Sequence, residues 1–242
     1  MGRESSVLVL DGAGERMAAL ALRIRGLGFR VVRAKTAEEA LPLLENPRLA
    51  CTAALLPPEW PVADLAGAVA ALRDVAGSDG LTFVGVGPRP APDGVERLRS
   101  AGVSLALWEP FGDSALRFQV NRALAGHRGD GQRRETRVPT EWLARVLAGG
   151  RRKEATVYSL SAGGAFLATP RPSLRGASVA LELPLPLREV AVGGRVVYTN
   201  VPGNLQRANL PLGMGVVFTA LAPEAEREIR RAVAESAFLL VV

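Results

Sequence analysis

The pattern of this sequence changes once, at the glycine-rich stretch 126–132, and the change requires two different kinds of fold. Before the stretch, short apolar runs alternate with segments whose apolar residues recur at helical spacing. The apolar runs are 7–10, 29–32, 51–56, 81–86 and 103–108. Strands that alternate with helices predict a parallel sheet covered by helices on both faces. We therefore expect an α/β doubly wound, five-stranded parallel sheet in a first domain, residues 1–125.

Beyond the stretch, short apolar runs follow one another at intervals of about ten residues, separated by Gly, Pro and Asn. These runs are 155–158, 165–168, 177–183, 188–192, 195–198 and 214–218. Such spacing is typical of a small antiparallel barrel. Pro223 then opens a segment with helical spacing up to residue 238. We expect a linker over 126–132 and a second domain over 133–242, a six-stranded antiparallel β-barrel with a C-terminal helix.

The charge is divided at the same place. Residues 1–125 contain 14 basic and 14 acidic side chains, whereas residues 126–242 contain 16 and 10, so the whole net charge of +6 lies in the second half. The second half is therefore the better candidate for an anionic partner. Nucleic acid is not expected, because no helix-turn-helix and no aromatic-rich recognition strand is visible.

Cysteine and histidine each occur once, as Cys51 and His127. One cysteine allows no internal disulfide, and the pair cannot form a Cys/His zinc site. His127 lies in the glycine-rich stretch, and a flexible segment does not hold a general base in a fixed position. No apolar run approaches the roughly 20 residues that cross a bilayer, and no signal peptide is evident. We expect a cytoplasmic protein that is not an enzyme and has no catalytic residue, metal or cofactor.

The first half resembles a response-regulator receiver domain over residues 6–125. The resemblance rests on the β/α alternation and on Trp108-Glu109-Pro110-Phe111, which is similar to that family's Lys-Pro-Phe turn. Phosphoryl transfer in receivers needs an acidic pair for magnesium, an acceptor aspartate and a lysine, because the developing negative charge requires cations. Here Asp11 is followed by Gly12, and Glu109 stands at the lysine position.

The acceptor position is occupied by Leu56 or Pro57, and neither can carry a phosphoryl group. The resemblance therefore implies a pseudo-receiver without a phosphoacceptor, kept as a docking or dimerisation surface. A homodimer is left open. A rival interpretation is a dinucleotide site at Gly12-Ala13-Gly14, but its third glycine is replaced by Met17. A tight turn in which Asp11 caps the following helix accounts for the same residues.

The second half carries two polar motifs. The first is Arg133-Arg134-Glu135-Thr136-Arg137, and the second lies in the run 158–167, which reads YSLSAGGAFL. Together with the run 213–218 and the final helix, they resemble the PilZ domain, the cyclic di-GMP receptor family, over about 130–236. The resemblance implies an Arg-x-x-x-Arg hook and a ligand-binding barrel face. The residues carried over to cyclic di-GMP binding are Arg133, Arg134, Arg137, Ser159, Ser161, Gly163 and Gly164.

The chemistry of these residues agrees with that ligand. The guanidinium fork can bind phosphate or the guanine O6/N7 edge, and its plane can stack on a base. Small Ser and Gly residues let a ligand approach the strand backbone. The chain departs from the family at Ser159, where the family has Asp or Asn. A lost hydrogen bond there costs on the order of 1–3 kcal/mol, so we expect weakened binding.

The function implied is that of a non-enzymatic bacterial signalling protein. Cyclic di-GMP would bind the hook and barrel, and the receiver-like domain would pass the signal to protein partners by reorientation or contact. The resemblance suggests an output in motility, exopolysaccharide or surface behaviour. The alternative is a ligand-independent adaptor with both domains degenerate. It would act through surfaces such as the apolar segment 238–242, which could instead pack on the protein's own core.

Overall fold

The computed structural model describes residues 5–12, 14–77, 80–130, 135–205 and 209–242, and of residues 127–130 it describes the backbone alone. The described residues divide into two units. Unit 1 contains the chain up to residue 130 together with Leu239–Val242, and unit 2 runs from residue 135 to Phe238. The sequence assigned Leu239–Val242 to the second domain, but these residues pack in unit 1.

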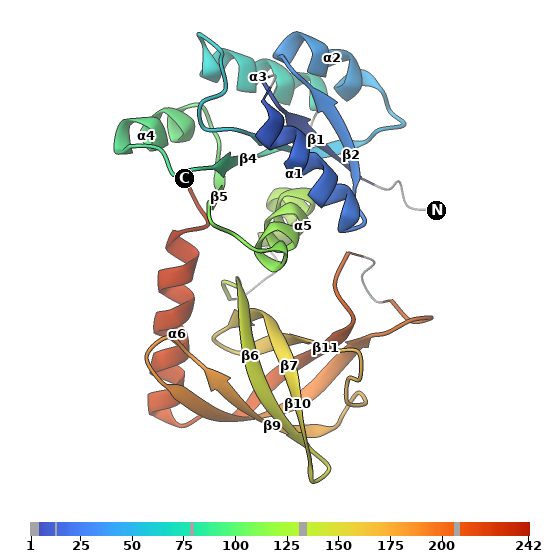
Figure 1. Cartoon of the computed structure of the whole chain (residues 1–242), viewed down its shortest axis with the longest axis vertical. Helices are drawn as coiled ribbons and strands as arrows, with labels where there is room; N and C mark the ends of the chain where they lie inside the picture. Colours follow the sequence, from blue (N-terminus) through green and yellow to red (C-terminus); the bar gives the residue numbers. More distant parts are fainter. Residues whose placement is uncertain (1–4, 13, 78–79, 131–134, 206–208) are drawn as a thin grey trace. The chain divides into compact units, whose positions relative to one another are not determined.

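Unit 1 is an α/β sandwich, as expected (Figure 1). In its described residues, five parallel strands have the order β2-β1-β3-β4-β5, a common order in doubly wound folds. The elements are β1 Ser6–Leu10, α1 Glu15–Gly26, β2 Arg30–Ala34, α2 Ala37–Glu45, β3 Cys51–Leu56, α3 Leu65–Ala76, β4 Thr82–Gly87, α4 Pro92–Ser100, β5 Leu105–Trp108 and α5 Asp113–Asp130.

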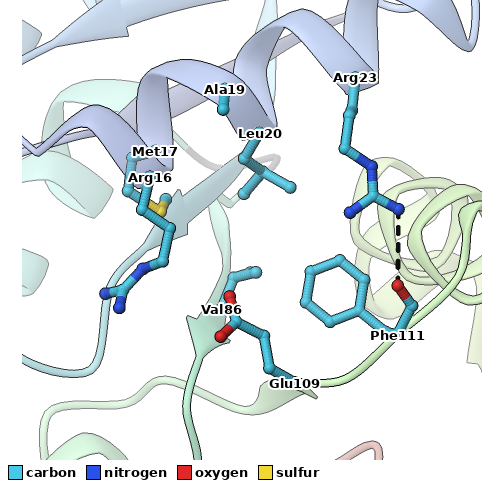
Figure 2. Close-up of a pocket in the computed structure, with 8 residues that line it drawn as sticks. All are labelled: Arg16, Met17, Ala19, Leu20, Arg23, Val86, Glu109 and Phe111. Atoms are coloured by element: carbon cyan, nitrogen blue, oxygen red, sulfur yellow. Dashed lines mark hydrogen bonds between the residues drawn. The ribbon is translucent and has the colours of Figure 1, made fainter.

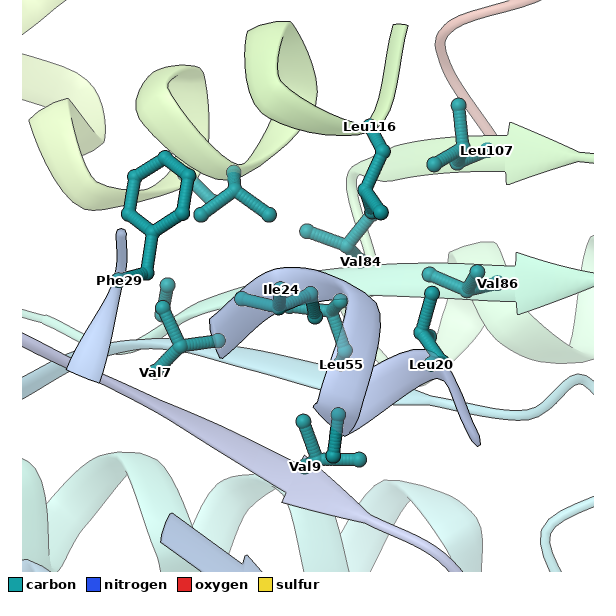
Figure 3. Close-up of a cluster of buried hydrophobic side chains, with 14 of the residues drawn as sticks. Val7, Val9, Leu20, Ile24, Phe29, Leu55, Val84, Val86, Leu107 and Leu116 are labelled. Atoms are coloured by element: carbon teal, nitrogen blue, oxygen red, sulfur yellow. The ribbon is translucent and has the colours of Figure 1, made fainter. Parts of the chain in front are cut away.

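The two faces of the sheet form separate apolar cores, because successive side chains of a strand point to opposite faces. Val7 and Val9 of β1 pack with α1 and α5 in one cluster, which is drawn in Figure 3. Leu8 and Leu10 pack in the second cluster, with residues of α2, α3 and α4. Every residue of β1 is buried, and so is every residue of β4. Burial on both faces explains why these strands appear in the sequence as uninterrupted apolar runs.

Helix boundaries follow from local chemistry. The Thr36 hydroxyl accepts a hydrogen bond from the Glu39 backbone N–H at 3.3 Å, and the Glu39 carboxylate accepts one from the Lys35 N–H at 2.8 Å. The first bond satisfies a backbone donor that the first turn of α2 leaves without a helical partner, and the second ties the residue before the N-cap to the same turn. Helix α5 continues to Asp130, past a break at Gly126 (φ +57°). The beginning of the expected linker is therefore helical, and residues 131–132 lie outside the described residues.

Unit 2 is a closed antiparallel barrel followed by a helix (Figure 1). Its described strands number six, in the order β10-β11-β8-β7-β6-β9. The elements are β6 Val138–Ala148, β7 Arg151–Ser161, β8 Gly164–Ala168, β9 Ser178–Pro184, β10 Glu189–Asn200, β11 Gly213–Ala220 and α6 Pro223–Phe238. Helix α6 contacts β6, β7 and β10, and its buried residues are Ala225, Ile229, Ala232 and Val233.

The strands of the barrel differ from the expected runs at two places. Strand β6 was missed, and it pairs with β7 through a hairpin turn at Gly149–Gly150. Two runs expected as separate strands form the single strand β10, which continues through Gly193 and Gly194. A Cβ atom at Gly194 would lie 2.5 Å from Val216 Cγ1, so the glycine serves close packing with β11 and does not end the strand.

Candidate functional site

The carboxyl ends of the strands in unit 1 are where a receiver would have its phosphorylation chemistry. Asp11 follows β1 and is 3% exposed. Its carboxylate forms an ion pair with the Arg33 guanidinium from β2, whose Nε lies 3.0 Å from Asp11 Oδ2. Helix α1 begins after Gly14, which as its N-cap residue forms no side-chain hydrogen bond. A protein cation already balances the carboxylate, which leaves less attraction for a metal ion.

The neighbouring strand ends have lost the other reactive groups. Leu56 and Pro57 are buried at the end of β3. Glu109 follows β5, and its peptide bond to Pro110 is cis. Arg16 of α1 forms an ion pair with Glu59. The charges at this end of the sheet are thus largely paired with one another.

A hollow of about 170 Å³ lies beside these residues, between α1 and the loop after β5 (Figure 2). Met17, Leu20, Val86 and Phe111 form its apolar lining. Arg23 lies at its edge, with Nη2 2.7 Å from Asp113 Oδ1. The Cζ atom of the same side chain lies 5.3 Å from the centroid of the Phe111 ring. Because its guanidinium is already engaged with a carboxylate and an aromatic face, the hollow is a poor phosphate site.

The second candidate site lies at one end of the barrel in unit 2. Arg133 and Arg134 of the hook lie outside the described residues. Arg137 is half-buried just before β6. Strand pairing joins the following residues to the second motif: Val138 pairs with Leu160, and Pro139 pairs with Ser159. The described part of the hook and the serine motif are therefore neighbours, although they are about twenty residues apart in the sequence.

Glu135 links the two motifs directly. Its Oε2 accepts a hydrogen bond from the backbone N–H of Gly163 at 2.7 Å. A Cβ atom at Gly163 would also lie 2.7 Å from that oxygen, so the carboxylate fits closely over a residue without a side chain. Sequence reasoning assigned no role to Glu135. The sequence did contain a signal for such a role, because Glu135 is the single acidic residue among the three arginines of Arg-Arg-Glu-Thr-Arg.

The two serines of the motif are buried in the structure. Ser159 is 5% and Ser161 2% exposed. The Ser161 hydroxyl donates a hydrogen bond to the Gly164 carbonyl at 3.2 Å and so closes the turn between β7 and β8. A Cβ atom at Gly164 would overlap the Val216 carbonyl oxygen, so the barrel itself requires this glycine. Their roles toward a ligand stay predictions.

Two general findings apply to the described parts of the chain. They contain no helix long and apolar enough to cross a membrane. Nor do these residues contain a group of three or more His, Cys, Asp or Glu side chains placed to hold a metal ion.

The thiol of Cys51, at the start of β3, has a pKa raised to about 11 by burial, an effect that nearby Arg30 partly opposes. A thiol of that kind is a weak nucleophile at neutral pH.

Comparison with known proteins identifies the second half. Residues 131–235 match the family described as the PilZ domain. Similar solved structures include the inhibitor of motility MotI/DgrA from Bacillus subtilis, at 15% identity and a TM-score of 0.38, over 44% of this chain and 52% of that one. The PilZ domain of YcgR from Escherichia coli, solved with c-di-GMP, is 18% identical with a TM-score of 0.35, over 44% and 92%.

The first half is similar to receiver proteins. The chemotaxis protein CheY4 from Vibrio cholerae is 19% identical, with a TM-score of 0.43, over 50% of this chain and 98% of that one. The chain spans only about half the length of the motility inhibitor that it matches. No curated protein sequence matches this chain significantly.

Proposed function

We propose, for a chain whose residues 131–235 are a PilZ domain, that this domain binds cyclic di-GMP through its arginine hook and barrel face. The protein would be a non-enzymatic receptor in bacterial signalling. Binding would be passed on by domain reorientation or by protein contacts made by the receiver-like unit. The outputs that the family suggests are motility, exopolysaccharide production and surface behaviour.

The observation that supports this proposal best is the hydrogen bond between Glu135 and Gly163. It joins the hook segment to the serine–glycine turn at one end of the barrel, at a distance of 2.7 Å. The backbone N–H of Gly163 thus already holds an anionic group. A ligand phosphate could use the same donor once Glu135 moves away, and the guanidinium of Arg137, two residues along the same segment, could then form an ionic hydrogen bond to that phosphate.

The ligand's chemistry fits the residue types at this end of the barrel. Cyclic di-GMP offers two phosphates and two guanine bases. Arg133, Arg134 and Arg137 can bind either group in a bidentate manner or stack on a base. Ser159 is shorter than the Asp or Asn of the family and can form fewer hydrogen bonds to guanine. We expect this difference to weaken binding about tenfold to a hundredfold.

The test is a calorimetric titration of the whole protein with cyclic di-GMP. Arg133→Ala and Arg137→Ala should each abolish the binding heat. Arg152→Ala is the matched control, because Arg152 lies at the start of β7 whereas the serine motif lies at its end. Its side chain is 73% exposed, so we expect unchanged affinity and unchanged folding.

Absence of heat and of any thermal shift at millimolar ligand would refute the proposal. Equal losses in Arg152→Ala and the hook variants would also contradict it, since a general charge effect would then explain binding. Absence of binding would leave the second candidate function, a ligand-independent adaptor. The paired Asp11 carboxylate favours an adaptor role for unit 1, whatever unit 2 binds.

A further inference from the structure

Strand β5 stands at the end of the sheet order in unit 1, so one of its edges has no neighbour among the parallel strands. An open edge presents unpaired N–H and C=O groups that attract another strand. Here residues Leu239–Val242 cover that edge. Val241 forms an antiparallel bridge with Leu105, and the end of the chain lies beside β5 (Figure 1).

Backbone hydrogen bonds hold this segment in register. The Ala106 N–H donates to the Leu240 carbonyl oxygen at 3.1 Å, and the Val242 N–H donates to the Ser104 carbonyl oxygen at 3.4 Å. The segment thus satisfies groups of the edge strand that would otherwise need water. It acts as an additional, antiparallel strand of a parallel sheet.

Two helices add polar side chains to the same segment. Gln119 of α5 is 1% exposed, and its Nε2 donates to the Ala106 carbonyl at 2.6 Å and to the Leu240 carbonyl at 2.9 Å. Arg99 of α4 donates from Nε to the Val242 carbonyl at 3.1 Å. Loss of the segment would deprive a buried amide of one partner, which is unfavourable. We call the edge of β5 with these two side chains the β5 groove, and in the structure it holds an extended segment of the same chain.

The side chains of the segment show which peptide the groove fits. Leu240 is 6% exposed, and Val242, like Trp108, packs against the apolar cluster that contains Leu98 and Val103. Leu239 and Val241 are 51% and 41% exposed. Buried and exposed apolar side chains therefore alternate along the segment, as expected for a strand on a sheet edge.

The segment belongs to unit 1 by its contacts and to the second half by its sequence. Helix α6 ends at Phe238, and the segment begins at the next residue. Four residues with so few hydrogen bonds gain much of their occupancy from this tether, which raises their local concentration. An identical segment from another molecule offers the same backbone groups and the same two apolar side chains.

We propose that the β5 groove is a strand-docking site, filled by the chain's own Leu239–Val242, and that the groove takes the same segment from a second copy when its own leaves. Exchange of this kind keeps every contact described above and loses only the tether. It would join two copies through their receiver-like units. This inference does not depend on cyclic di-GMP.

The test mixes two complementary variants of the full chain. The first lacks Leu239–Val242 and offers an empty groove. The second carries Arg99→Ala and Gln119→Leu, which weaken its own groove but leave its segment intact. We expect each variant alone to sediment as a monomer. Their mixture should form a heterodimer, because the groove of the first variant has no tethered segment that competes with the segment of the second.

Control variants distinguish docking in the β5 groove from non-specific association. Leu240→Asp added to the second variant should abolish the heterodimer, whereas Val241→Asp should leave it intact because that side chain is exposed. Circular dichroism reports whether each variant is folded. A mixture of folded variants that stays monomeric would overturn the proposal, and so would equal effects of the two Asp substitutions.

A labelled peptide covering residues 235–242 gives a second measurement. Fluorescence anisotropy should show binding to the deletion variant and at least tenfold weaker binding to the intact chain, whose groove is filled. Equal binding to both, or binding to neither, would contradict a groove that exchanges its occupant.

Discussion

The ion pair between Asp11 and Arg33 supports a stability prediction that can be worked out from the structure. The Asp11 side chain is only 2% exposed, whereas that of Arg33 is 40% exposed. We consider the change Arg33→Met, which keeps an unbranched apolar side chain and removes the cation. The buried carboxylate of Asp11 would then lose its ionic partner while remaining largely out of water.

Removing one partner of a fully buried ion pair costs about 3–5 kcal/mol. Water can reach this pair from the Arg33 side, which reduces the cost, so we expect the free energy of unfolding of unit 1 to fall by about 2 kcal/mol. Adding Asp11→Asn to Arg33→Met removes the buried negative charge. The double variant should therefore recover about 1 kcal/mol relative to Arg33→Met.

Urea unfolding followed by tryptophan fluorescence measures this effect. The Trp142→Phe background leaves Trp60 and Trp108, both in unit 1, as the reporters. The reasoning would be refuted if Arg33→Met unfolded within about 0.5 kcal/mol of its background, the range of an ordinary surface substitution. It would also fail if Asp11→Asn gave no recovery in the double variant.

Three further predictions concern other parts of the chain. Incubation with acetyl phosphate and magnesium should add no phosphoryl group detectable by intact mass spectrometry, because Leu56 and Pro57 occupy the acceptor position; a stable adduct on unit 1 would contradict this. The Cys51 thiol should react only slowly with a disulfide reagent at pH 8 until urea is added. Its pKa of about 11 leaves roughly one thiol in a thousand ionised at that pH. Equal reaction rates in the native and the unfolded protein would contradict the burial of this thiol. Gly164→Ala should lower the stability of the barrel by about 1–3 kcal/mol, because its Cβ overlaps the Val216 carbonyl. Gly163→Ala should displace only the Glu135 carboxylate, so its melting curve should stay close to that of the unchanged protein.

The sequence by itself determined the architecture of both halves. Apolar runs buried on both faces indicated the parallel strands of unit 1. Pro223 indicated the start of α6, which begins at that residue. These features are local, because each depends on residues within one element and its flanking turn. Close spacing of short runs in the second half predicted a barrel in the same way.

Local patterns failed where neighbours in space decide the structure. Strand β6 was missed because Leu143 and Leu147 are exposed, at 55% and 42%, which obscures its alternation. Gly193 and Gly194 resemble a turn, yet β10 passes through them because β11 packs closely there. The partner of Asp11 was also not predicted, since Arg33 comes from a neighbouring strand.

The barrel site and the C-terminal segment show the same difference between local pattern and tertiary structure. Motif residues alone indicated a hook and a serine–glycine turn, and β6–β7 pairing brings their described parts together. Only the tertiary structure joined Glu135 to Gly163, because the distance between two motifs depends on strand register. It also decided where the apolar segment Leu239–Val242 lies. Four apolar residues can cover any open edge, and the groups that hold them, on β5 and on Gln119, come from more than a hundred residues earlier in the chain.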